Sequence, residues 1–306
     1  MSLLTAQQIA RVSVALLGRA LILPRTTTRV PGEEYAGPSG GTVTLRVRVP
    51  RTARVQATPG DQITMDGLEE VSVPVVLSHL YNGTNLTDED LTLTLESFAE
   101  QVAQPMVGAI ARGAEDQIAT VMNLMIPAAD FNNLAAANID DAILAAREQL
   151  GRAEVPLGNR WLAVSPEFAS AMLGDANESQ VEQAGTPSAL RDAVIDRRRG
   201  FTVVESSSLA PGAAVAYHQS AFAMGLRAPV NAPGAASSAS ASEDGIALRV
   251  LRDFDITRLS EGVVASTFAG AAAVLDQDPE PDSGSGEPEP IQRRAVRMQL
   301  AEESGA

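Results

Sequence analysis

Apolar residues near the start of the chain recur at helical spacing. In residues 6–23 they fall near a 3.6-residue period, which predicts an amphipathic helix that ends at Pro24. Ile9, Val12 and Leu16 belong to its apolar face. Because an apolar face is unfavourable in water, this helix needs a partner, and we expect these three side chains to contact a neighbouring copy of the chain.

Strict alternation of apolar and polar residues replaces this pattern from residue 42. Residues 42–49 alternate between Val or Leu and Thr or Arg, so Arg46 and Arg48 share the polar face of a predicted strand. A turn at 58–61 and renewed alternation at 71–75 make residues 42–77 an extended two-stranded hairpin. An isolated hairpin of this length has too small a core, so it must lie on another surface, such as a second subunit.

A long helix and a mixed unit follow the hairpin. Pro105 starts the helix, and apolar residues spaced along 106–125 predict that it is the backbone of its domain. Short strands and helices then alternate from residue 137, with helix caps at Asn138 and Ser165. This order predicts an α/β unit over residues 137–228.

The last third of the chain combines loops, strands and an acidic segment. Residues 229–244 are rich in Ala, Ser, Pro and Gly and predict a loop, whereas residues 246–251 and 263–268 predict strands that return to the long helix. Residues 276–306 begin as an acidic, Pro-rich, low-complexity stretch and predict a tail, with a short amphipathic helix over 291–300.

Composition excludes several classes of protein. The 306 residues are 45% hydrophobic and 20% charged, which is typical of a globular protein large enough for more than one domain. The longest apolar stretch, residues 12–23, contains Gly18 and Arg19 and is too short to span a membrane. We expect no export signal, because Pro24 and Arg25 stand where a signal peptide has small residues.

Candidate chemistry is sparse. All 23 basic residues are arginine and cysteine is absent, which excludes thiolate sites, Schiff-base lysines, the P-loop lysine and lysine–asparagine cross-links between subunits. His79 and His218 lack acidic or hydroxyl partners at motif spacing, so we interpret both as structural. We predict no catalytic residue, no cofactor and no metal site.

Charge is segregated along the chain. The net charge is −15, yet residues 1–60 hold eight arginines against two acids, while residues 61–150 hold two arginines against fifteen acids. Such complementary segments can neutralise each other within one chain or between neighbouring copies. We therefore expect Arg46 and Arg48 to pair with acids of an adjacent subunit. The candidate acids are Glu69, Glu70, Asp88, Glu89 and Asp90.

Asp88, Glu89 and Asp90 also admit two other interpretations. Three adjacent carboxylates after Thr87 could bind a metal ion, but an N-cap threonine followed by an acidic first turn explains the same residues without a ligand. We favour the helix start.

Taken in order, these parts resemble the major capsid proteins of tailed phages, the Hong Kong ninety-seven fold. Local similarities occur in the same order along residues 1–275. They lie at 71–80 leading into 86–90, at 115–118, at 162–166, at 200–206 and at 249–255.

The resemblance implies an α+β fold with defined parts. They are an N-terminal arm (1–41), an extended β-hairpin loop (42–77), a peripheral domain with the long helix (78–136), an α/β axial domain (137–228), strands returning to the peripheral domain (229–275) and an acidic C-terminal tail (276–306).

The resemblance also implies a function and partners. The chain would be a structural coat protein, not an enzyme, that self-assembles as pentamers and hexamers into an icosahedral virion capsid and expands during packaging of double-stranded DNA. Its other partners would be a separate scaffolding protein, a portal and a decoration protein, with assembly in the host bacterial cytoplasm and no contact with a membrane.

Three alternatives stay open at this point. An encapsulin-like cellular compartment shares the same fold, and its cargo would distinguish it from a virus. An α/β enzyme that acts through Asp and Glu is compatible with the composition, although no carboxylate pair indicates one. A binding module that uses residues 291–300 is the third.

Overall fold

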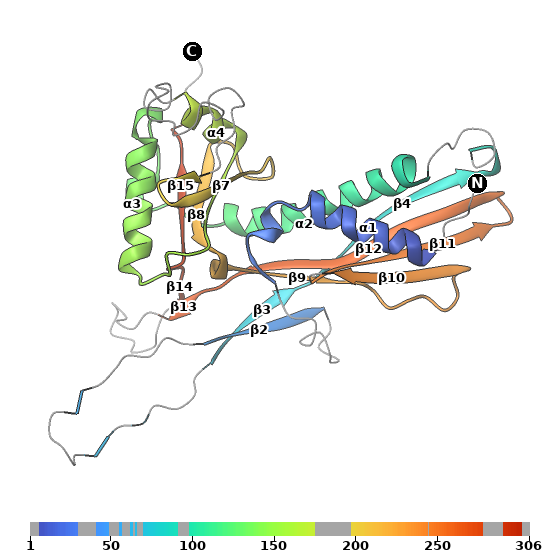
Figure 1. Cartoon of the computed structure of the whole chain (residues 1–306), viewed down its shortest axis with the longest axis horizontal. Coiled ribbons are helices and arrows are strands. Elements are labelled where there is room, and N and C mark those ends of the chain that lie inside the picture. The colour runs from blue at the N-terminus through green and yellow to red at the C-terminus, as the bar shows by residue number, and fades with distance from the viewer. Residues whose placement is uncertain are drawn as a thin grey trace.

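The computed structural model describes residues 6–29, 41–48, 55–56, 62–63, 65, 70–90, 98–174, 197–243, 245–277 and 290–301. Two sheets organise most of these residues into two domains that meet at the carboxyl end of a long helix (Figure 1). A third, two-stranded sheet projects from them.

The peripheral domain is a six-stranded sheet with two helices on one face. Helices α1 (Ala6–Ala20) and α2 (Gln104–Asn123) lie side by side, α1 over β10 and β11 and α2 over β4 and β12 (Figure 1). The strands run in the order β1-β9-β12-β11-β10, and β4 pairs with β12. Their bounds are β1 (Thr28–Arg29), β4 (Ser78–Thr87), β9 (Phe222–Arg227), β10 (Ser237–Glu243), β11 (Ile246–Asp255) and β12 (Ser260–Ala273).

Helical periodicity explains the packing of α2. Proline stands in its first turn, and every fourth residue from Met106 onward is buried against the sheet. These buried residues are Met106, Ile110, Ala114, Ile118 and Met122. The helix predicted after Pro105 is therefore confirmed.

The axial domain is a five-stranded sheet in the order β15-β8-β5-β7-β6, with α3 (Ile139–Arg152) and α4 (Pro166–Leu173). Alternation along the strands separates its two faces: Leu162 and Val164 belong to the α3 and α4 core, whereas Trp161 and Ala163 belong to the core shared with α1 and α2. The strand bounds are β5 (Arg160–Val164), β6 (Arg197–Arg198), β7 (Phe201–Glu205), β8 (Ala213–His218) and β15 (Ala295–Gln299).

Short elements connect these parts. Strands β2 (Thr42–Arg48) and β3 (Glu70–Val76) form the projecting hairpin, and β13 (Asp276–Gln277) pairs with β14 (Pro290–Ile291). The single-turn elements are η1 (Leu23–Arg25), η4 (Ala99–Ala103), η5 (Ala129–Phe131), η6 (Ala136–Asn138) and η7 (Gln219–Ala221).

Three segments differ from the sequence-based prediction. Residues 237–243, expected in a loop, form strand β10, because alternating Ser and Ala fill an edge position against β11 despite their low strand propensity. Residues 222–227, expected in the axial unit, form β9 and pair with β12 of the peripheral sheet. Residues 295–299, expected in a helix within a tail, form β15 and pair with β8.

Candidate assembly surfaces

The base of the predicted hairpin is confirmed as a two-stranded antiparallel ladder. Thr42 pairs with Val76 and Arg48 with Glu70, and the sheet contains no third strand among the described residues. Val43, Val73 and Val75 are buried against Ala223 and Val274, so one face of the base rests on its own chain. Strands β2 and β3 project away from both domains (Figure 1).

Ion pairing on the hairpin differs in part from the expectation. The Arg46 Nη1 atom lies 3.6 Å from Glu70 Oε2 across the same hairpin, so Glu70 already has a partner within its own chain. The Arg46 side chain is 73% exposed, which leaves it accessible to a second carboxylate. Arg48 lies in β2 opposite Glu70, and Glu69 lies outside the described residues.

The acidic segment after β4 is a helix start, as the sequence indicates. The Thr87 N–H and hydroxyl both donate to Asp90 Oδ2, at 3.0 and 2.7 Å, and the Asp90 N–H donates to the Thr87 hydroxyl. This reciprocal capping lowers the pKa of Asp90, mainly through the hydroxyl hydrogen bond. Asp88 and Glu89 are exposed and available to a neighbouring subunit.

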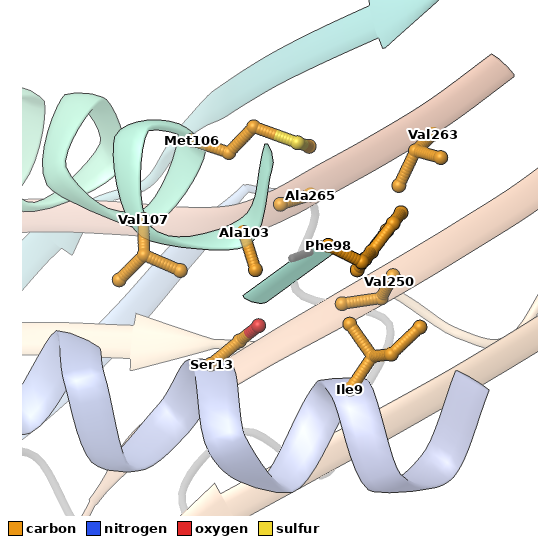
Figure 2. A pocket seen from close by; sticks show the side chains of 9 residues that line it. All are labelled: Ile9, Ser13, Phe98, Ala103, Met106, Val107, Val250, Val263 and Ala265. Carbon is orange, nitrogen blue, oxygen red and sulfur yellow. The ribbon is translucent and has the colours of Figure 1, made fainter. Parts of the chain in front are cut away.

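Helix α1 finds its partner within the chain, contrary to the expectation for Ile9. Ile9 is 4% exposed and packs with Val250 and Val263 around a cavity of about 10 Å³ (Figure 2). Val12 is 45% exposed and Leu16 is half-buried. Of the three predicted contact residues, Val12 is therefore the one whose side chain most plainly faces outward.

The N-terminal segment is fastened to both domains. The Ile22 N–H donates to Glu115 Oε1 of α2 at 2.7 Å, and the Thr26 hydroxyl hydrogen bonds to the Tyr217 hydroxyl of β8. Burial raises the pKa of Glu115, although its backbone hydrogen bonds oppose the shift. Burial raises the pKa of Tyr217 as well.

An ion cluster anchors the axial domain. Asp140, at the first turn of α3, accepts from Arg198 Nε at 2.6 Å and from Arg199 Nη2 at 2.8 Å. Burial alone would raise the pKa of Asp140, but the two arginines outweigh it and lower that pKa. Arg198 is buried and binds a carboxylate of its own chain.

Both histidines make contacts within their own chain. His79 packs its ring against Phe268, with 4.8 Å between centroids. His218 Nδ1 accepts from the Ser220 N–H at 3.2 Å and so caps η7, while burial and then the charges of Arg294 and Arg160 lower its pKa. Within the described ranges, no three Asp, Glu or His side chains are grouped to hold a metal ion.

Other exposed apolar side chains mark surfaces that the chain leaves uncovered. On the projecting loop Val55 is 92% exposed and Met65 is 82% exposed. At the turn between β11 and β12, Ile256 is 80% exposed and Leu259, with a φ of 45°, is 58% exposed. No described helix is long and apolar enough to cross a membrane.

Comparison with known proteins gives one family and one fold. Residues 69–279 match the model of a family described as phage capsid protein. No curated protein sequence matches the chain.

Solved structures share the fold over nearly the whole chain. A chain from Mycobacterium phage Che8 has a TM-score of 0.63 at 17% identity and covers 91% of this chain and 90% of its own. The mature capsid of bacteriophage PhiM1 has a TM-score of 0.56 at 15% identity, covering 92% and 87%. A virus-like particle from Pyrococcus furiosus has a TM-score of 0.52 at 10% identity, covering 95% and 98%.

Proposed function

The chain belongs to the family of phage capsid proteins, and from this premise we propose that it forms an icosahedral shell of pentamers and hexamers around double-stranded DNA. The expected α+β capsid fold is confirmed by its structural neighbours, and the family and the fold make it a structural coat protein. The details of assembly are our proposal.

One observation carries this proposal: the hairpin β2–β3 projects from the body and exposes side chains that its own chain does not cover (Figure 1). Arg46 is largely exposed on its polar face, and Val55 and Met65 are exposed farther along the loop. Burial of such apolar side chains against a second subunit is favourable, and heterologous contacts of this kind generate rings where the rotation between subunits closes.

We assign the complementary surface to the exposed acids at the start of the helix after β4. Asp88 and Glu89 are free of the capping contacts that Thr87 makes with Asp90. A contact between Arg46 or Arg48 of one subunit and Asp88 or Glu89 of the next would combine charge attraction with apolar burial.

Charge reversal tests the contact. The double variant Arg46→Glu, Arg48→Glu is expected to remain folded by circular dichroism and to elute as a monomer instead of forming shells, because a surface ion pair such as that of Arg46 with Glu70 contributes little to folding. The matched control Arg46→Lys, Arg48→Lys keeps both charges and should form particles. Particles of normal size and yield from the reversed variant would exclude the contact.

The proposal includes partners and a conformational change. A separate scaffolding protein, a portal and a decoration protein act with the shell, which is assembled in the host bacterial cytoplasm. The shell expands on DNA packaging as the hairpin swings while both domains, including α1 of the N-terminal arm, stay rigid. Equal diameters of empty precursors and filled particles would contradict the expansion.

A cellular compartment is the second candidate, favoured by the likeness to the virus-like particle from Pyrococcus furiosus. The family match favours the phage coat over it. Purified particles that hold DNA support the phage coat, whereas particles that hold one host protein support the compartment.

A further inference from the structure

The C-terminal strand crosses from one domain to the other. Strand β15 adds an edge strand to the axial sheet beside β8, and residues 290–291 before it pair with 276–277 at the end of the peripheral domain (Figure 1). We call residues 290–300 the strap. The family match ends at residue 279, so the strap lies beyond it.

Alternation along β15 places Arg297 between the domains. Val296 and Met298 are buried in the core formed with α3 and α4, and Ala295 belongs to the core shared with α1 and α2. Arg297 shares the face of Ala295, because residues two apart on a strand point the same way. A cation therefore stands on a largely apolar face that is turned toward α2.

Arg297 caps the carboxyl end of α2. Its Nη1 donates to the carbonyl oxygen of Asn123, the last residue of the helix, and to that of Met125 at 2.7 Å. Its Nη2 donates to Gln299 Oε1 at 3.1 Å. The last carbonyls of a helix lack partners within it and carry partial negative charge, so a cation there satisfies hydrogen bonds and complements the helix dipole.

A second arginine fastens the other end of the strap. Arg294 Nε donates to Asp276 Oδ2 at 2.8 Å, and Nη1 donates to Ser220 Oγ at 3.2 Å. Asp276 follows β12 of the peripheral sheet, and Ser220 lies in η7, where the chain passes from β8 to β9. The strap is thus bonded at both places where it meets the boundary between the domains.

Directional contacts of this kind restrain rotation more strongly than apolar packing does. Besides the hydrogen bond between the Thr26 and Tyr217 hydroxyls, the remaining contact at this boundary includes the apolar packing of Tyr217 and Leu209 in the shared core, and apolar burial has no preferred direction. Asn123 adds only its side-chain bonds to the Ala210 N–H and the Ser208 carbonyl, at 3.0 and 3.4 Å.

We propose that the strap fixes the angle between the axial domain and the long helix, with Arg297 as the positioning residue that holds it. Loss of Arg297 leaves both domains folded and lets them rotate about the end of α2. The consequence for shells rests on the proposed function: coat subunits in which the angle between the axial domain and α2 varies close into particles of mixed size.

Distance measurement between spin labels tests the angle directly. The chain has no cysteine, so Asp116→Cys on α2 and Gln149→Cys on α3 can be labelled selectively at exposed positions. The labelled chain is diluted into an excess of unlabelled chain. Pulsed electron paramagnetic resonance then gives the distribution of distances between the two labels of one chain. Arg297→Met, which keeps an unbranched apolar stem and removes the guanidinium group, is expected to broaden that distribution, as is Arg294→Met at the other end.

Two controls separate the strap from general instability. Arg152→Met removes an exposed arginine of α3 that pairs with Glu148 and should leave the distribution narrow. A second label pair within the axial domain, Gln149→Cys with Glu167→Cys, should stay narrow in Arg297→Met. Broadening of this internal pair, or an unchanged interdomain distribution, would overturn the proposal.

The same experiment distinguishes this inference from the proposed function. The label distances require no shell, so a chain that never assembles still tests the strap. If shells form and the interdomain distribution of Arg297→Met equals that of the parent chain, the strap proposal fails while the coat function stands.

Discussion

The carbonyl oxygen of Val76 lies so close to Gly270 that a Cβ atom at position 270 would be 2.1 Å from it. Val76 ends strand β3 of the hairpin, and Gly270 lies in β12 of the peripheral sheet. The hairpin base therefore crosses the sheet at a point where only a residue without a side chain fits. This crossing sets the direction in which the hairpin leaves the body.

Gly270→Ala is expected to lift the hairpin base off β12. The added methyl group requires movement of backbone, which costs about 1–3 kcal/mol of stability. Trypsin cleaves only after arginine in this chain, so faster cleavage at Arg46 reports the displaced base. Gly262→Ala is the matched control on the same strand, where the nearest atom is 3.4 Å away. Equal cleavage rates in the two variants would contradict the crossing.

The hydrogen bond from the Ile22 N–H to Glu115 predicts how the stability of the folded chain depends on the acceptor oxygen and on the charge of residue 115. Glu115→Ala removes the acceptor of the Ile22 N–H and is expected to cost about 1–3 kcal/mol in urea unfolding. Glu115→Gln keeps an acceptor oxygen and removes the buried charge, so it should be at least as stable as the parent chain near neutral pH.

The difference in stability between Glu115→Gln and the parent chain changes with pH in a definite direction. Because burial raises the pKa of Glu115 in the folded chain, its contribution to stability is full below the unfolded value and is lost as pH rises through the folded value. The stability advantage of Glu115→Gln should therefore shrink as pH falls toward the ordinary glutamate pKa. A difference in stability between the two proteins that stays constant over this range would show that the charge of Glu115 is not destabilising.

The contribution of Asp140 to stability depends on pH in the opposite direction. The two arginines lower its pKa, so its contribution is present above the unfolded value and is lost as pH falls through the folded value. Asp140→Asn leaves the buried Arg198 without its carboxylate and is expected to cost about 3–5 kcal/mol at neutral pH, with a smaller difference in acid. Asp141→Asn, an exposed neighbour on the same turn, should be nearly neutral. Similar losses in both variants would exclude a specific role for Asp140.

The orientation of α1 on the peripheral sheet predicts which substitutions on the helix destabilise the chain. Ile9→Ala empties a buried site and is expected to cost about 2–5 kcal/mol, whereas Val12→Ala at an exposed site should change stability by no more than about 0.5 kcal/mol. Thermal and urea unfolding measure both. A larger loss for Val12→Ala would mean that the helix is rotated.

Local patterns predicted most elements of the fold. Proline at the start of α2, Ser165 before α4 and strict alternation in β2 each fix an element through a short-range preference that sequence carries. Strand β10 is not predicted because its Ser and Ala residues have no strand signal. Strand β15 is not predicted because an amphipathic segment of ten residues fits both the helical and the strand period.

Long-range pairing could not be predicted in the same way. Arg198 meets Asp140 across 58 residues of chain, and Arg297 meets Asn123 across 174. Arginine in a run or on an amphipathic stretch is normally solvated, so neither residue carries a local sign of burial. The expected contact of Ile9 with a neighbouring subunit is wrong for a related reason: periodicity shows that a face is apolar but not what covers it.

Electron microscopy of the chain, expressed alone and with its neighbouring genes, tests the central claim most directly. Closed icosahedral shells, or capsomer-sized oligomers that close when a scaffolding protein is added, are the predicted result. A monodisperse monomer under every condition would contradict the account of this chain as a self-assembling coat protein.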